Sequence, residues 1–184
     1  MRIIAGTAHG QTIKAPAGRD TRPTTDRVRE AIFSALTPFL EGAYVLDAFA
    51  GSGALGLEAL SRGAAGVVFC EQARPAQLAI KENLAKLGLQ ERGQLLCGAV
   101  EQQLPRWVEN AKSQAFDIVL LDPPYNRGLI AKIEPLLLGE GVLAEGALVM
   151  LETAAKEPEL FADSRWRQLK NRVYGDPAVY YWEL

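Results

Sequence analysis

Apolar runs of strand length alternate along this chain with segments that have the period of an amphipathic helix. Such alternation is typical of a parallel sheet whose strands are joined by crossover helices. The runs are almost continuously apolar, which indicates strands buried on both faces. We therefore predict an α/β fold with strands at residues 44–46, 66–70, 94–97, 116–121 and 147–151. Helices are expected between them, at residues 53–62, 75–87, 99–110 and 128–138.

The carboxyl-terminal part of the chain departs from this alternation. Residues 166–174 and 178–184 flank the turn sequence Gly175-Asp176-Pro177. Two strand-like runs around such a turn predict an antiparallel hairpin, which would close the sheet.

The amino-terminal part is also distinct. Short apolar-polar stretches at residues 2–5 and 12–15 predict a small hairpin. A helix should follow from residue 25 or 26 to residue 40, because Thr24, Thr25 and Asp26 are good N-caps. We thus expect an extension over residues 1–40 and a main domain over residues 41–184.

Composition limits the class of protein. With 184 residues, 48% of them hydrophobic and 23% charged, the chain fits one globular domain with a short appendage. Two cysteines, Cys70 and Cys97, and the single histidine, His9, cannot form a conventional zinc site, so we predict no metal. No apolar run reaches the roughly 18 residues of a membrane span, and the first residues lack the apolar core of a signal peptide. These features predict a cytoplasmic protein without a membrane partner.

The sequence Asp122-Pro123-Pro124-Tyr125 directly follows the apolar run at 116–121. Proline lacks an N–H and fixes its own φ, so this loop should be stiff, with carbonyl groups that can accept hydrogen bonds. Asp122 adds a side-chain acceptor, and Tyr125 adds a flat face on which a base can stack. Together they would suit a planar base with an exocyclic amine. A strand exit with prolines and a nearby packed aromatic is the structural alternative.

A glycine-rich turn follows the first predicted strand. Gly51, Gly53 and Gly56 surround Ser52 and would let a ligand approach the backbone and the start of a helix. Glu71 ends the second strand, where an acid can bind both hydroxyls of a ribose. An NAD site shows the same outline, but Asp47, placed where an ammonium group could bind, favours S-adenosylmethionine as the cofactor.

Charge is uneven along the chain. Residues 1–30 contain six basic and three acidic residues, a net charge of +3, whereas the rest of the chain carries −5. A basic arm is consistent with phosphate contacts, and a solvated arm is the alternative. The candidate RNA contacts on it are Arg19, Arg22, Arg27 and Arg29.

Three blocks then resemble a known family. The segments RIIAG at 2–6, TRPTTDRVREAIF at 21–33 and GALGLEALSR at 53–62 are similar to those of the RsmD family, bacterial 16S ribosomal RNA guanine-N2 methyltransferases. The resemblance covers nearly the whole chain. It implies a Rossmann-like class I methyltransferase with a seven-stranded, mostly parallel sheet. It also implies 16S rRNA as partner, within the small ribosomal subunit or an assembly intermediate.

The resemblance also implies residue roles. Asp47 and residues 51–53 would surround the methionine end of S-adenosylmethionine, and Glu71 would bind its ribose. Gly98 and Ala99 would meet the adenine through backbone groups, because Gly98 has no side chain where the family often has Asp or Asn. Asp122, a carbonyl of Pro123 and Tyr125 would face the guanine.

One departure from the family pattern weakens the expected RNA contact, and two other functions stay open. Where the family usually has Trp-Arg-Gly-Arg, this chain has Ala8-His9-Gly10-Gln11, which removes two charges and an aromatic ring. An adenine-N6 methyltransferase on DNA or RNA would use the same amine clamp. An NAD-type oxidoreductase or a nucleotide-binding module could use a similar sheet.

Overall fold

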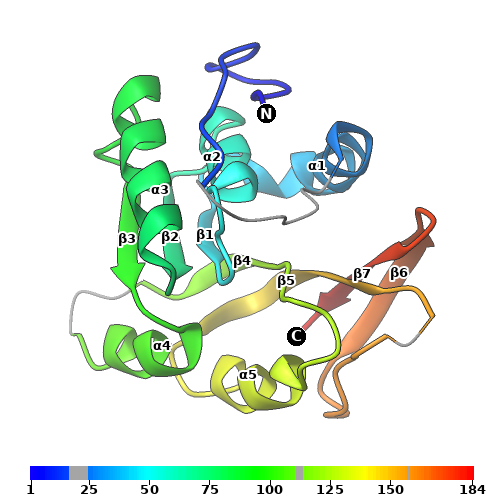
Figure 1. The fold of residues 1–184 in the computed structure, drawn as a ribbon. Helices are drawn as coiled ribbons and strands as arrows, with labels where there is room; N and C mark the ends of the chain where they lie inside the picture. The colour runs from blue at the N-terminus through cyan, green and yellow to red at the C-terminus, as the bar shows by residue number, and fades with distance from the viewer. Residues whose placement is uncertain (17–24, 111–113, 157) are drawn as a thin grey trace.

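A computed structural model describes residues 1–16, 25–110, 114–156 and 158–184 (Figure 1). Within these residues the chain forms a seven-stranded sheet in the order β3-β2-β1-β4-β5-β7-β6. The strands are β1 Tyr44–Asp47, β2 Gly66–Glu71, β3 Gly93–Cys97, β4 Phe116–Leu121, β5 Leu143–Ala154, β6 Arg167–Val173 and β7 Pro177–Glu183. The predicted α/β architecture with a closing hairpin is confirmed.

The first five strands are parallel, and the last two run as an antiparallel hairpin against β5. β1 lies between β2 and β4, with Leu46 opposite Val68 on one side and Val119 on the other. From β1 the chain passes to β2 and β3 on one side of the sheet, and then returns to place β4 on the other side of β1. The topological switch point therefore lies between β1 and β4. Open α/β sheets bind ligands at such a point.

β5 is longer than the sequence predicts. It continues past the expected end at residue 151 through Glu152 and Thr153 to Ala154, and pairs with β7 along this extension. Glu152 and Thr153 are polar but buried, so the apolar pattern ends before the strand does. Long-range pairing with β7 therefore determines the end of this strand.

Helices cover both faces of the sheet (Figure 1). Side chains of α1 Asp26–Leu40, α2 Ala54–Ser61 and α3 Arg74–Leu87 share one buried cluster with the sheet. Those of α4 Val100–Val108 and α5 Leu129–Leu137 share a second cluster on the opposite face. Adjacent residues of β1, Val45 and Leu46, belong to different clusters, as expected for a strand buried on both faces. Among the described residues, no helix combines the length and apolarity that a membrane crossing requires.

α2 packs unusually close to the sheet. A Cβ added at Gly56 would lie 2.3 Å from Cε1 of Phe69 in β2, so this position accepts only glycine without rearrangement. The third glycine of the predicted motif thus allows close helix–sheet packing.

The amino-terminal extension is fastened to α2. Its predicted hairpin is present as an antiparallel bridge between Arg2 and Thr12, flanked by backbone hydrogen bonds between residues 1–3 and 10–13. The buried Glu58 carboxylate accepts hydrogen bonds from the N–H groups of Ile4 and Ala5, at 2.8 and 3.0 Å. Ser61 donates to the carbonyl of Ala5, at 2.6 Å, so side chains of α2 hold this segment.

We expect Gly6→Ala to destabilise this attachment. Gly6 has φ +83°, and an added Cβ would lie 1.8 Å from the carbonyl oxygen of Ser61. Gly10 is a matched control, because its φ is +77° and nothing lies within 4 Å of an added Cβ. Both variants carry the backbone strain, so Gly6→Ala should lose about 1–3 kcal/mol more unfolding free energy than Gly10→Ala in urea titrations. Equal losses would show that the close approach to Ser61 does not matter.

Candidate active site

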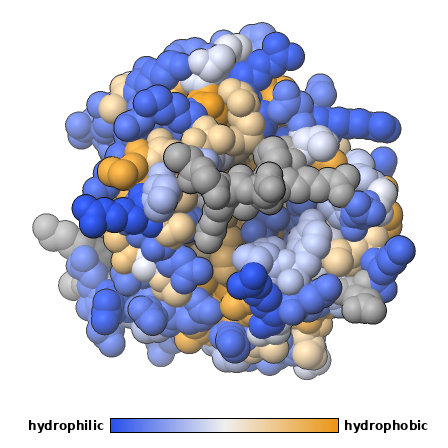
Figure 2. Space-filling model, viewed as in Figure 1, coloured by the Kyte–Doolittle hydropathy of each residue, from blue (hydrophilic) through white to orange (hydrophobic). Residues whose placement is uncertain are grey.

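The carboxyl ends of β1, β2, β4 and β5 meet around a cavity of about 810 Å³. This lies within the usual range for ligand pockets, about 300 to 1,000 Å³. On the face shown in Figure 2, polar side chains surround a central hollow where hydrophobic side chains are visible. The cavity has two chemically different ends, one at the glycine turn and one at the loop after β4.

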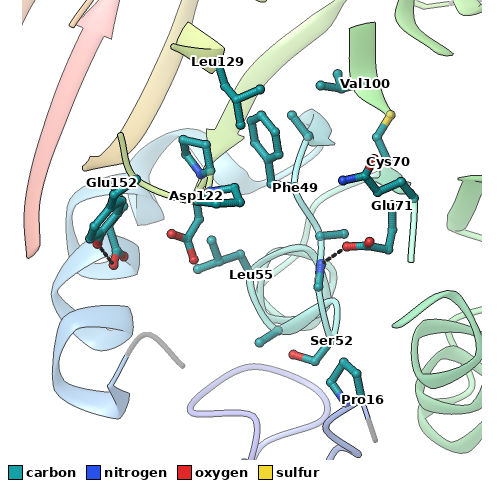
Figure 3. Close-up of a pocket in the computed structure, with 18 of the residues that line it drawn as sticks. Pro16, Phe49, Ser52, Leu55, Cys70, Glu71, Val100, Asp122, Leu129 and Glu152 are labelled. Atoms are coloured by element: carbon teal, nitrogen blue, oxygen red, sulfur yellow. Dashed lines mark hydrogen bonds between the residues drawn. The ribbon is translucent and has the colours of Figure 1, made fainter. Parts of the chain in front are cut away.

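At the first end, Glu71 organises the glycine turn (Figure 3). One carboxylate oxygen accepts the N–H of Gly51 at 2.8 Å, and the other accepts the N–H of Ala73 at 2.6 Å. Glu71 is only 7% exposed but lines the cavity. Each carboxylate oxygen has two lone pairs, so Glu71 can hold the turn and still accept ligand hydroxyls.

The other predicted cofactor residues divide into two groups. Gly51, Ser52, Gly98 and Ala99 line the cavity, in keeping with their predicted roles. Gly53 is buried directly before α2 and positions the helix start.

Asp47 is placed differently from its prediction. Its side chain is 1% exposed and accepts the N–H of Gly56, in the first turn of α2, at 2.9 Å. Burial raises the pKa of Asp47 to about 7, the Gly56 hydrogen bond lowers it, and the charge of Glu71 raises it. Direct binding of a ligand ammonium by Asp47 was expected, but the buried carboxyl instead contacts the first turn of α2. We therefore assign Asp47 the role of supporting this helix.

At the second end lie the residues of the predicted amine clamp, in the loop after β4. Asp122, Pro123 and Tyr125 all line the cavity, and the Asp122 carboxylate points toward Leu55 (Figure 3). The hydroxyl of Tyr125 donates to Oε1 of Glu152 at 3.0 Å.

The lining residues that the sequence analysis did not predict include Phe49 and Glu152. Phe49 places an aromatic ring in the cavity from the loop after β1 (Figure 3). Glu152 is 5% exposed and lies at the carboxyl end of β5. The signal for Glu152 was an acid directly after a buried run, the same signal that marks Asp122.

The predicted RNA-binding arginines are not equivalent. Arg19 and Arg22 lie outside the described residues. Arg27 is exposed and lines a smaller hollow with Tyr174 and Gly175.

Arg29 requires a correction. Its side chain is 1% exposed and donates to the carbonyl of Arg2 and, at 3.0 Å, to Asp26. A guanidinium held in this way joins α1 to the amino-terminal segment. We therefore remove Arg29 from the residues expected to contact phosphate.

Neither a metal nor a thiol is indicated at the site. In the described part of the chain, no group of three His, Cys, Asp or Glu residues could hold a metal ion. Cys70 lines the cavity, but burial, with the charges of Asp47 and Glu71, raises the pKa of its thiol to about 12. Cys70 is thus a neutral thiol at physiological pH and a poor nucleophile.

The strand order, the glycine turn after β1 and the acid that ends β2 define a Rossmann-like fold of the class I methyltransferase type. The family model described as Conserved hypothetical protein 95 matches residues 1–183. The chain belongs to this family, the RsmD family.

Known proteins agree with this placement. Ribosomal RNA small subunit methyltransferase D of Escherichia coli K12 is 37% identical over 178 residues, covering 97% of this chain and 87% of that protein. The solved structure of yhhF from Escherichia coli matches with a TM-score of 0.86 and 35% identity, covering 100% of this chain and 97% of that one. SMU.776, solved in complex with SAH, shares the fold at a TM-score of 0.68 and 16% identity, covering 85% of this chain and 49% of that one.

The position of Asp47 predicts a pH-dependent stability. In the folded protein the Asp47 carboxyl stays protonated up to about pH 7, whereas in the unfolded chain it loses its proton near a pKa of about 3.9. The stabilising contribution is therefore complete below about pH 4 and is lost as the pH rises to about 7. Asp47→Asn keeps an oxygen for Gly56 but cannot ionise. We compare the unfolding free energies of wild type and Asp47→Asn. The value for wild type minus that for the variant should decrease as the pH rises from about 4 to about 7, by up to about 1.4 kcal/mol per pH unit. Urea titrations at several pH values measure this difference, and a pH-independent difference would contradict the assignment.

Proposed function

We propose that this protein transfers a methyl group from S-adenosylmethionine to the exocyclic N2 amine of a guanine in 16S ribosomal RNA of the small subunit. The observation that carries the proposal is the single cavity, in which Glu71 and the glycine turn lie at one end and Asp122 with Tyr125 at the other. A cofactor and a base could thus meet in one site. Membership of the RsmD family supports the same reaction.

The first end of the cavity fits a nucleoside cofactor. Glu71 offers a buried carboxylate to ribose hydroxyls, and the turn at Gly51 and Ser52 offers backbone groups. Gly98 lines this part of the cavity and has no side chain, so it can offer only backbone groups to a ligand. S-adenosylmethionine would supply an activated methyl group on a sulfonium.

We expect Glu71→Ala to lower the affinity for S-adenosylhomocysteine at least tenfold. Hydrogen bonds to a charged group are worth about 1.5–3 kcal/mol, and about 1.4 kcal/mol corresponds to one decade of affinity. Because Glu71 also holds Gly51 and Ala73, loosening of the turn must be separated from loss of ribose contacts.

An analogue that lacks the ribose 2′-hydroxyl makes this separation. Wild type should bind the deoxy analogue more weakly than S-adenosylhomocysteine, whereas Glu71→Ala should bind the two alike. Isothermal titration measures both. If the variant still distinguishes the two ligands as wild type does, Glu71 does not contact the ribose.

The second end of the cavity is suited to an amine. Asp122 and the carbonyl of Pro123 can accept its N–H groups, and Tyr125 or Phe49 can stack on the base. Hydrogen bonds from the amine favour a pyramidal nitrogen, and the carboxylate stabilises the positive charge that develops on it. Positioning supplies most of the acceleration, and no nucleophilic side chain is needed.

RNA is the substrate class that the relatives favour over DNA. The Escherichia coli relative is named a ribosomal RNA small subunit methyltransferase, and this chain covers most of its length. We propose that the extension over residues 1–40 faces the RNA, with the exposed Arg27 beside the cavity mouth. Proteins reach a base most easily in unpaired RNA, so the target guanine should be unpaired. Such a substrate would place the protein in the cytoplasm.

Methylation of small-subunit particles tests the function. The purified protein should transfer labelled methyl from S-adenosylmethionine to the particles, and mass mapping should place it on guanine N2. Asp122→Ala should lower single-turnover transfer by about 100-fold or more, because it removes charge stabilisation in the transition state. Its S-adenosylmethionine affinity should stay within a few-fold of wild type. Label on an adenine, or normal turnover in the variant, would refute the proposal.

A further inference from the structure

Glu152 is a buried acid that lines the cavity from β5, beside the loop that holds Asp122 and Tyr125. Its side chain is 5% exposed and lines the cavity at the end where Tyr125 lies. Tyr125 donates to its Oε1 at 3.0 Å. A buried acid is tolerated where hydrogen-bond donors reach it, and Tyr125 supplies one such donor at the edge of the cavity.

The backbone holds Glu152 firmly. Glu152 lies near the end of β5, where it pairs with Val179 of β7, and the preceding residue, Leu151, pairs with Leu121 of β4. A carboxylate on a central strand is positioned more rigidly than one on a loop. In Figure 3 its carboxylate and that of Asp122 point to the same side of the cavity. Two acceptors therefore face the space that the target base would occupy.

We propose that Glu152 reads the Watson–Crick edge of the target base and selects guanine by accepting its N1–H. This inference rests on the function proposed above. Guanine presents adjacent N1–H and N2–H donors, which match acceptors at Glu152 and Asp122. Adenine presents a lone pair at N1, which would face the carboxylate and be rejected. An ionised carboxylate accepts hydrogen bonds but cannot donate them, so it distinguishes the two bases by the direction of one hydrogen bond.

The substrate that tests this role is RNA with 2-aminopurine at the mapped target position. 2-Aminopurine keeps the exocyclic 2-amine but has a lone pair at N1 in place of N1–H. A site built for a donor rejects an analogue that lacks it, because the buried acceptor is left without its partner. Wild type should therefore have a KM for the 2-aminopurine RNA at least about tenfold higher than for the guanine RNA.

Glu152→Gln is the matching protein variant. Glutamine keeps an oxygen for the hydroxyl of Tyr125 but can also donate to N1 of 2-aminopurine. The guanine preference in single-turnover kcat/KM should fall at least about tenfold, toward equal use of the two RNAs. Comparing the two proteins cancels the intrinsic difference in amine reactivity. Unchanged S-adenosylhomocysteine affinity shows that the variant is folded.

Tyr125→Phe controls for an indirect role. It removes the hydroxyl that contacts Glu152 but leaves the carboxylate, so the guanine preference should persist even if the rate falls. A loss of preference equal to that in Glu152→Gln would overturn the proposal, because Glu152 would then act through Tyr125. If Glu152→Gln methylates guanine with an unaltered preference over 2-aminopurine, the proposed role of Glu152 is wrong but the proposed function stands. Transfer to an adenine amine would defeat both. If Glu152→Gln does not fold, equal wild-type KM values for the two RNAs would still overturn it.

Discussion

Two buried carboxylates at the ends of neighbouring parallel strands hold the loop on which the site depends. Asp47 at the end of β1 accepts the N–H of Gly56, and Glu71 at the end of β2 accepts the N–H of Gly51. Buried acids are costly unless hydrogen-bonded, and here the donors are backbone groups of the loop and helix themselves. Burial raises the pKa of Asp47, and the nearby charge of Glu71 raises it further. The loop is therefore held on its side toward the sheet, and its other side lines the cavity.

This arrangement separates the tasks of the cavity. Glu71 and the turn at Gly51 form one end, while Asp122, Tyr125 and Glu152 form the other. The ends of β1, β2, β4 and β5 supply these residues, so the sheet sets the distance between the proposed cofactor group and the proposed base group. A rigid sheet suits methyl transfer, because alignment of donor and acceptor supplies much of the acceleration.

The amino-terminal extension is held by α2, the helix that directly follows the glycine turn. Glu58 and Ser61 of α2 hold residues 4–8, and Arg29 ties α1 to Arg2. Arg29 is thus a structural connection rather than a free positive charge. Its burial shows that net charge along a segment does not reveal which charges remain accessible.

The sequence by itself determined the strand and helix order, the glycine turn, the acid at Glu71 and the cluster from Asp122 to Tyr125. These features are local: apolar period, turn residues and motif spacing mark them without knowledge of distant contacts. Only the tertiary structure decided that Asp47 lies under α2, that Arg29 is buried, and that Glu152 enters the cavity. Each of these depends on pairing or packing between residues far apart in the chain. β5 extends to Glu152 and beyond because β7 pairs with it, and no pattern around residue 152 records that partner.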